Sequence, residues 1–288
     1  MKKYYQFAGL SLEISISEDR MYETEGQLGP FRRKTVTDPH QFAFDVVESL
    51  EKPEGTQQIL LPGLMAYRKG SRTVRYVGTL MGEWQNAYMR ISHNGKLHQV
   101  QLRTDQFPGR IPARAVLNAL SIEHLLLECG SVLLHSSFIV RNGQGILFTA
   151  PSGAGKSTQA DLWHQHRRAE IINGDRAAIC VRQERIYAAG VPFSGSSHYC
   201  ENKTVPLAAV VYLAQAPVTA VHRLRGIQAF RRIWEGISLN TWDKEDVEQA
   251  AALVEQIAVD VPVLYMPCTP DESAVTALEE ELKKLEQL

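Results

Sequence analysis

The residues best suited to chemistry in this chain form a run of glycines, small side chains and one lysine at 150–158, which reads A-P-S-G-A-G-K-S-T. The run follows the apolar stretch 146–149 and precedes helical spacing from Gln159 to Gln165. In such a run, backbone N–H groups and the positive end of the following helix converge on one point, and Lys156 adds a full charge. The pattern predicts a phosphate-binding loop for a nucleoside triphosphate.

The expected roles within the loop follow from residue type. Lys156 would reach the β- and γ-phosphates, and the hydroxyl of Ser157 or Thr158 would take one position around a Mg²⁺ ion, which prefers oxygen ligands. Ala150 departs from the strict motif, which has glycine there. The alternative is a turn of small residues that only caps a helix. The residues expected to bind the nucleotide are Ser152, Gly153, Ala154, Gly155, Lys156, Ser157 and Thr158.

Two further side chains are candidates for the same site. Asp175 ends the apolar stretch I-I-N-G-D at 171–175, where a carboxylate could bind a metal or accept a proton. A turn aspartate is the alternative for Asp175. His135 lies on a strand one hairpin upstream of the loop, so it could contact phosphate or position a carboxylate. A hydrogen-bonded core histidine is the alternative for His135.

Other polar residues carry weaker signals. The segment 190–198 combines glycines, hydroxyls and a histidine, which is typical either of a binding loop or of a surface connection. Several cations could neutralise a transferring phosphoryl group, although each alone is more simply read as a solvated surface residue. These cations are Lys203, Arg223, Arg225, Arg231 and Arg232.

The 288 residues are enough for one large or two modest domains. Charged residues make up 22% and the formal net charge is -1, so the composition favours neither a nucleic acid nor an anionic membrane as partner. No apolar run approaches the roughly 20 residues needed to cross a bilayer, and the first residues do not resemble a signal peptide. We therefore expect a cytoplasmic protein. The four cysteines are widely spaced and suggest neither a zinc site nor a disulfide framework.

The order of predicted elements favours two domains. The first hundred residues show alternating apolar spacing and an Asn-Gly turn at 94–95, which predict a β-rich domain over 1–110. Helical spacing follows from Ala113 to Cys129, within a second domain over 111–288. There, Val132 to Val140 and Gly145 to Thr149 predict an antiparallel hairpin that leads directly into the loop.

Taken together, these residues resemble the catalytic half of the HPr kinase/phosphorylase family, which is similar in fold to ATP-dependent phosphoenolpyruvate carboxykinase. The resemblance covers about residues 130 to 280 and rests on His135, the hairpin, the loop and the sequence N-G-D-R at 173–176. It is closest to small HPr-kinase-like proteins found beside peptide-modification genes, through Pro192 to Ser197 and Cys268 to Val275.

The resemblance implies a mixed-sheet α/β kinase core behind a β-rich N-terminal domain. It implies that the chain transfers phosphate from ATP, with Mg²⁺, to a serine or threonine of a small protein or peptide. Lys156, Ser157 and His135 match the family's site, and Asp175 matches the first residue of its paired aspartates, so catalysis would rest on Asp175, His135 and Lys156. The metal ligands would be Ser157 and Asp175. A homo-oligomer is also implied.

One position departs from the family pattern, because Arg176 replaces the second aspartate of the pair. The arginine could weaken Mg²⁺ binding, or it could neutralise the γ-phosphate. Together with Ala150, this departure leaves two alternatives open. One is a nucleotide-binding sensor with little catalysis. The other is chemistry on a small molecule, either phosphorylation of a hydroxy metabolite or a carboxykinase-type reaction.

Overall fold

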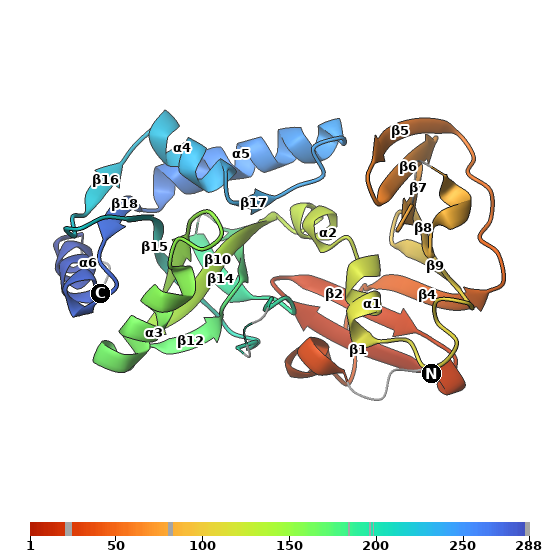
Figure 1. The fold of residues 1–288 in the computed structure, drawn as a ribbon, viewed down its shortest axis with the longest axis horizontal. Helices are drawn as coiled ribbons and strands as arrows, with labels where there is room; N and C mark the ends of the chain where they lie inside the picture. The colour runs from red at the N-terminus through yellow and green to blue at the C-terminus, as the bar shows by residue number, and fades with distance from the viewer. Residues whose placement is uncertain (21–24, 80–82, 184, 196, 198, 286–288) are drawn as a thin grey trace. The chain divides into compact units, whose positions relative to one another are not determined.

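The computed structural model describes residues 1–20, 25–79, 83–183, 185–195, 197 and 199–285. These residues form a mixed α/β structure that contains two mixed β-sheets (Figure 1). They divide into two compact units. Unit 1 comprises residues 1–6 and 10–121, and unit 2 comprises residues 7–9 and 122–288.

The division between the units falls after Ser121, later than the boundary expected near residue 110. The single helix expected from Ala113 to Cys129 is instead two helices, α1 (Ala113–Ala119) and α2 (Ile122–Glu128). Ser121 separates them because its φ angle of 49° is left-handed and cannot continue a helix. Helix α1 packs on the short helix η2 (Gly26–Phe31), so it belongs to unit 1.

Unit 1 is β-rich, as its alternating apolar spacing predicts. In the described residues its sheet has the order β3-β1-β2-β4-β9-β8-β7-β6-β5, in which β2, β4 and β9 are parallel neighbours. The expected hairpin around the Asn-Gly pair is present as β8 and β9. The strands are β1 (Lys2–Phe7), β2 (Leu10–Ser15), β3 (Arg32–Arg33), β4 (His40–Val47), β5 (Thr56–Leu61), β6 (Leu64–Lys69), β7 (Arg72–Val77), β8 (Met89–Asn94) and β9 (Leu97–Arg103).

Unit 2 contains the second mixed sheet and the longer helices. Its strands are β10 (Ser131–Arg141), β11 (Gln144–Thr149), β12 (Glu170–Asn173), β13 (Arg176–Arg182), β14 (Arg185–Gly190), β15 (Thr204–Gln215), β16 (His222–Leu224), β17 (Ile237–Ser238) and β18 (Val263–Cys268). After α2, its helices are α3 (Lys156–Arg167), α4 (Ile227–Trp234), α5 (Lys244–Asp260) and α6 (Glu272–Lys284).

The predicted hairpin before the loop is confirmed, since β10 and β11 pair antiparallel with Ser136 opposite Thr149. On its other edge β11 pairs parallel with β15, which in turn pairs parallel with β18. The long strand β10 pairs with β11 through its second half and with β13 through its first half. The hairpin thus brings the strand that carries His135 beside the strand that leads into the loop.

Helices cover both faces of the sheet of unit 2 (Figure 1). On one face, α4 and α5 bury apolar residues such as Ile233 and Val254 against β10, β13 and β15. On the other face, α3 and α6 pack Trp163 and Leu278 against β11, β15 and β18. Trp163 is fully buried, and it fixes α3 and the loop that precedes it to the sheet. The core of unit 2 therefore lies directly behind the candidate site.

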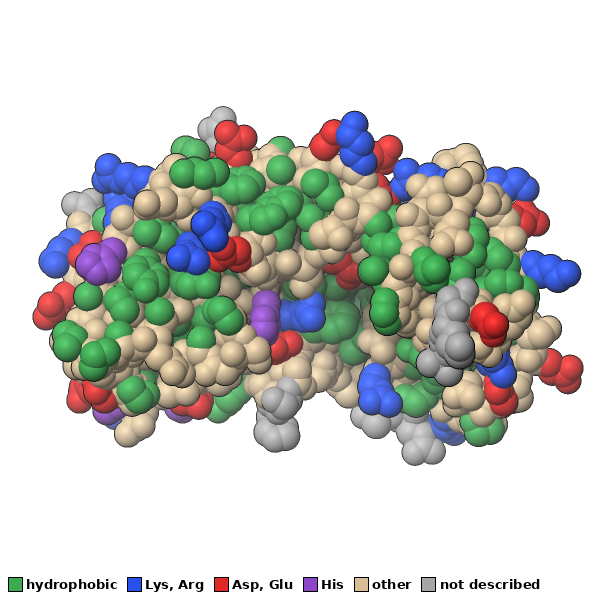
Figure 2. Space-filling view, turned by 45° about the horizontal axis from the view of Figure 1, so that its top comes forward, with side chains coloured by type: hydrophobic (Ala, Val, Ile, Leu, Met, Phe, Trp, Pro, Cys, Tyr) green, Lys and Arg blue, Asp and Glu red, His purple; other side chains and the backbone are tan. Residues whose placement is uncertain are grey.

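The surface is mixed in charge. Figure 2 shows one face of the molecule, on which acidic and basic side chains are interspersed with hydrophobic ones. In the part of the chain that the structure describes, no helix has the length and apolar character needed to span a membrane.

Candidate functional site

The loop 150–158 lies between the end of β11 and the start of α3. Gly153 and Gly155 have φ angles of 79° and 106°, a backbone region that side chains disfavour. A Cβ atom on either glycine would meet no atom within 4 Å, so the backbone, and not the packing, requires glycine there. Ala150 has no positive φ angle, and its side chain is buried in the apolar cluster around Phe148. Alanine therefore fits where the strict motif has glycine.

Lys156 is the first residue of α3 and is only 8% exposed. Its Nζ donates to the carbonyl oxygens of Ala150 at 3.1 Å and Pro151 at 3.4 Å. No ion pair with a carboxylate is found for Lys156 among the described residues. Burial lowers the pKa of the Lys156 ammonium, and the charge of Asp175 opposes that shift. A buried cation held only by carbonyls is stabilised when an anion binds beside it.

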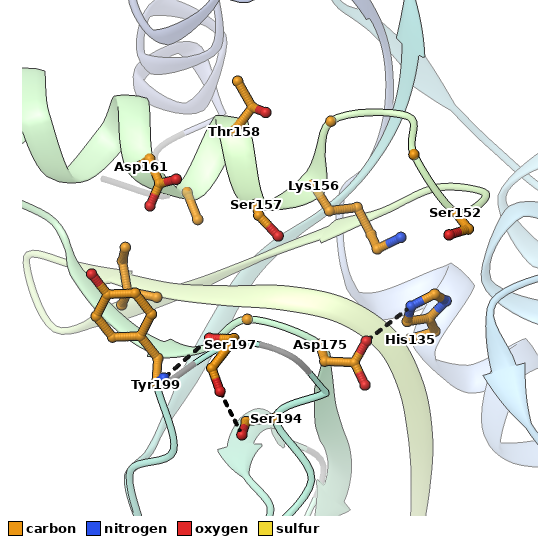
Figure 3. Close-up of a pocket in the computed structure, with 15 residues that line it drawn as sticks. His135, Ser152, Lys156, Ser157, Thr158, Asp161, Asp175, Ser194, Ser197 and Tyr199 are labelled. Atoms are coloured by element: carbon orange, nitrogen blue, oxygen red, sulfur yellow. Dashed lines mark hydrogen bonds and ion pairs between the residues drawn. The ribbon is translucent and has the colours of Figure 1, made fainter.

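A cavity of about 510 Å³, here called the loop cavity, opens beside Lys156. It is bordered by the loop, by His135 and Asp175, and by Ser194, Ser197 and Tyr199 (Figure 3). In Figure 3 the Ser157 hydroxyl points toward the side that carries Asp175, whereas the Thr158 side chain points the opposite way. Among the two expected hydroxyls, Ser157 is therefore the one that faces the carboxylate.

Asp175 follows β12 in a turn that Asn173 closes. The Asn173 amide is fully buried, and its Oδ1 accepts the backbone N–H groups of Asp175 at 2.9 Å and Arg176 at 3.0 Å. Its Nδ2 donates to the carbonyl oxygen of Val191 at 2.9 Å. The carbonyl oxygen of Asp175 accepts the N–H of Ser136 at 3.0 Å. These bonds fix the backbone of Asp175 between β10 and the segment after β14.

Two glycines let the chain close around Asp175. A Cβ on Gly195, whose φ angle is 55°, would lie 2.8 Å from the Asp175 Cγ atom. A Cβ on Gly174 would collide with the side chain of Ser197. The hydroxyl of Ser194 donates to the carbonyl oxygen of Ser197 at 2.9 Å and holds this turn together. Small residues at 174 and 195 are thus required by the close approach of two segments.

His135 is positioned through its own backbone. Its N–H donates to the carbonyl oxygen of Gly236 at 2.8 Å, and its carbonyl oxygen accepts the hydroxyl of Thr149 at 3.0 Å. Its Nε2 lies 3.2 Å from Asp175 Oδ1, and the two side chains are 37% and 30% exposed. Burial first, and then the charge of Lys156, lower the pKa of His135, while Asp175 acts to raise it. The imidazole is therefore neutral near pH 7, and this contact places its proton on Nε2.

Arg176 lies on the other side of the carboxylate. Its Nε is 3.5 Å from Asp175 Oδ2, and its Nη1 donates to the hydroxyl of Ser238 at 2.8 Å. Its guanidinium carbon lies 6.0 Å from the centre of the Phe193 ring. Asp175 is thus held between a neutral imidazole and a guanidinium.

The structure brings most of the expected residues to one place. The predicted residues that border the loop cavity are His135, Ser152, Gly153, Gly155, Lys156, Ser157, Thr158 and Asp175. Ala154 borders a neighbouring cavity beside Gln215 instead. Within 190–198, Ser194 and Ser197 reach the loop cavity, while Ser196 and His198 lie outside the described residues. Among the weaker candidates, Lys203 pairs with Glu170.

Sequence reasoning missed several residues of the site. Asn173 is one of them, and an asparagine just before Gly-Asp is a sequence signal for a side-chain turn. Asp161 and Tyr199 also border the loop cavity. Asp161 follows Ser157 by one helical turn, so its placement could have been inferred from α3. Tyr199 had no comparable local signal.

The chain was compared with family models, curated proteins and solved structures, and similarity was found to solved structures. No family model matches the chain, and no curated protein matches it. Among solved structures, the chain is similar to the HPr(Ser) kinase/phosphatase from Coxiella burnetii, with 10% sequence identity and a TM-score of 0.34. That match covers 54% of this chain and 98% of the other.

Proposed function

We propose that this protein is an ATP-dependent kinase that transfers the γ-phosphate to a serine or threonine hydroxyl of a small protein or peptide. The observation that carries the proposal is the buried Lys156 ammonium, whose hydrogen-bond partners among the described residues are carbonyl oxygens. It lies at a helix N-terminus beside a cavity of about 510 Å³. Such a group is suited to binding phosphate. Asp175 and His135, paired at 3.2 Å, lie on the border of the same cavity and supply proton chemistry there.

In the proposed reaction the acceptor oxygen attacks the γ-phosphorus of ATP. A bond from that oxygen to phosphorus forms, and the bond from the γ-phosphorus to the bridging oxygen of ADP breaks. The Asp175 carboxylate accepts the hydroxyl proton, while the neutral His135 donates from Nε2 to Oδ1 and holds the carboxylate in place. Lys156 and the N–H groups of the loop stabilise negative charge on the phosphates.

The oxygen groups of the site also fit Mg²⁺. Ser157 offers a hydroxyl and Asp175 a carboxylate, and both border the loop cavity. These residues would hold the ion together with phosphate oxygens, and the bound ion would neutralise phosphate charge. Arg176 adds a permanent positive charge beside Asp175, which fits a role in balancing phosphate charge rather than in binding metal.

The proposal is tested by mass spectrometry of small proteins and peptides from the native cell extract after incubation with Mg-ATP and the protein. We expect a phosphate mass on one polypeptide with the wild type and none with Lys156→Ala. Asp175→Asn should lower transfer by about a hundredfold or more while the affinity for ATP without Mg²⁺ changes little, because Asp175 is assigned to the metal and the proton and not to the phosphates. Calorimetric titration with ATP provides the separate binding measurement.

Two outcomes contradict this function. ATP binding without any phosphorylated product would indicate a nucleotide sensor. Phosphate found only on a small molecule would indicate a metabolite kinase. Near-normal transfer by Asp175→Asn would remove the assigned role of that carboxylate and leave the nucleotide site intact.

A further inference from the structure

A second cavity, of about 580 Å³, lies on the other side of His135 and is here called the arginine cavity. His135 borders both cavities. The arginine cavity is bordered by Thr149 at the end of β11, by Ala150 and Pro151 of the loop, and by the short strand β17, which contains Ser238. Arg176, Arg232 and Tyr212 also border it. It is therefore separate from the loop cavity, and His135 is the residue that borders both.

The charged groups in this cavity give it an excess of positive charge. Arg176 is 36% exposed, and the contacts to Ser238 and Asp175 account for two of its five N–H donors. Arg232 is 35% exposed, and its guanidinium carbon lies 4.4 Å from the centre of the Tyr212 ring. Glu235 also borders the cavity, but it accepts hydrogen bonds from both Arg232 at 2.9 Å and Arg231 at 2.8 Å. Arg231 and Arg232 thus share the carboxylate of Glu235, which neutralises only part of the positive charge at the cavity.

The position of the cavity fits the geometry of phosphoryl transfer. The attacking oxygen must approach the γ-phosphorus roughly opposite the leaving oxygen. Lys156 is the residue of the loop expected to contact the β- and γ-phosphates of a bound nucleotide. The ammonium of Lys156 contacts the carbonyls of Ala150 and Pro151, and both residues border the arginine cavity. An acceptor in this cavity would therefore lie beside the part of the loop that the Lys156 ammonium contacts.

On the basis of the proposed function, we infer that the arginine cavity is the acceptor site, and that it selects a peptide with an acidic residue next to the phosphorylated serine or threonine. The hydroxyl would lie near His135, which borders both cavities and lies 3.2 Å from Asp175. The neighbouring carboxylate would bind the guanidinium groups of Arg176 and Arg232. Arginine is suited to this task because its planar fork can donate two parallel hydrogen bonds to one carboxylate. Tyr212 would supply an aromatic surface beside the peptide.

The test uses three synthetic nine-residue peptides that share one central serine and carry glutamate, alanine or lysine on both sides of it. Phosphate transfer from Mg-ATP to each peptide is measured over a range of peptide concentrations. We expect the glutamate peptide to be phosphorylated about tenfold more efficiently than the alanine peptide, and the lysine peptide least. In Arg176→Gln and Arg232→Gln the ratio between the glutamate and alanine peptides should fall toward one. That ratio is independent of a general loss of turnover.

Arg231→Gln is the matched control. Arg231 is 73% exposed and shares Glu235 with Arg232, but it does not border the arginine cavity. It should keep the wild-type preference for the glutamate peptide. Circular dichroism and thermal unfolding of all three variants show whether each is folded.

Separate binding measurements distinguish failure of this inference from failure of the proposed function. If calorimetry shows that the wild type does not bind Mg-ATP, the kinase assignment itself fails. If Mg-ATP binds but no polypeptide of the native extract and none of the peptides is phosphorylated, the kinase assignment fails as well. If the extract contains a phosphorylated polypeptide but the glutamate and alanine peptides are phosphorylated equally or not at all, the acceptor assignment is overturned. A glutamate preference that survives in both Arg176→Gln and Arg232→Gln overturns it as well, because the acidic residue is then recognised elsewhere, as at the turn from Ser194 to Ser197.

Discussion

Asn173 makes three hydrogen bonds that hold the segment of the candidate catalytic carboxylate in place. Its amide bonds to the backbone of Asp175, Arg176 and Val191, so it joins the end of β12 to the segment that encloses the site. Asn173→Ala removes all three bonds and should lower the free energy of unfolding by about 2 kcal/mol. Turnover should fall by about tenfold or more because Asp175 loses its fixed position. Transfer assays and calorimetry with ATP measure the two effects.

Asn173→Ser is the companion variant, since a serine hydroxyl can form the same kind of turn more weakly. We expect it to recover part of the lost turnover, with ATP affinity within about twofold of the wild type in both variants. A parallel loss of ATP affinity and turnover would show that Asn173 supports the whole site rather than Asp175 alone.

At the scale of elements, the loop 150–158 depends on backbone that only glycine adopts easily. Gly155 has a φ angle of 106° and open space where a Cβ would lie. Gly155→Ala should therefore introduce backbone strain of about 1–2 kcal/mol without a steric clash. Because the strain is relieved when the loop changes shape, we expect ATP affinity to fall about tenfold, as measured by calorimetry.

Gly143→Ala is the matched control for this strain. Gly143 lies in the turn between β10 and β11 with a φ angle of 77°, and it too has open space around a Cβ. It should lose a similar amount of stability in urea unfolding and keep its ATP affinity. Equal losses of affinity in the two variants would mean that the loop geometry itself has no special part in binding.

Helices α2 and α5 are joined by a partly buried ion pair. His124 Nδ1 lies 2.7 Å from Asp246 Oδ1, and the Asp246 side chain is only 4% exposed. The hydrogen bond to Asp246 raises the pKa of His124, and burial opposes the shift. A raised folded pKa means that this stabilisation is complete below the unfolded pKa of about 6.5 and is lost as the pH rises through the folded value.

Asp246→Asn should therefore destabilise the protein more at pH 6 than at pH 9. At pH 6 we expect a loss of about 1.5 kcal/mol, the low end for a charged hydrogen bond, because His124 is partly exposed. Glu128→Gln is the comparison, since Glu128 Oε1 lies 3.5 Å from His124 Nε2 and is 44% exposed. It should change stability much less. Urea unfolding at both pH values measures this, and a pH-independent loss in Asp246→Asn would contradict the charged pair.

At the scale of the whole molecule, the sequence predicts local structure better than long-range arrangement. The hairpin of β10 and β11 is marked by apolar runs around a turn, and the structure confirms it. The break at Ser121 has no clear signal in the sequence, because the apolar spacing continues from α1 into α2 across the left-handed residue that separates them. The parallel pairing of β11 with β15 has no local signal, since it joins strands far apart in the chain.

For the candidate site too, the sequence predicts the individual residues better than their arrangement in space. Lys156, Ser157, His135 and Asp175 were found from residue type and the order of elements, and the structure places them around one cavity. Their roles stay predictions, as do ATP, Mg²⁺, the acceptor and the oligomeric state. The arginine cavity combines Arg176 and Tyr212 with the start of the loop and α4, and only the folded sheet brings these together.

A bound nucleotide should alter the dynamics of unit 2 in a way that hydrogen exchange can locate. Ligand at about 100 times its dissociation constant adds about 2.7 kcal/mol to the stability of the state that binds it. The loop is continuous with β11 and α3, and Trp163 fixes α3 to Phe148 and Leu264 in one cluster. Slowly exchanging amides of β11 and α3 should therefore slow by up to about a hundredfold with Mg-ATP.

Inorganic phosphate at the same concentration should protect the loop less, because a single phosphate contacts only part of the loop, whereas a triphosphate contacts all of it. In Lys156→Ala neither ligand should protect the amides from exchange, since the substitution removes the one buried cation of the loop 150–158. Protection by Mg-ATP that persists in Lys156→Ala, or that leaves β11 and α3 unchanged in the wild type, would place the nucleotide at a different site.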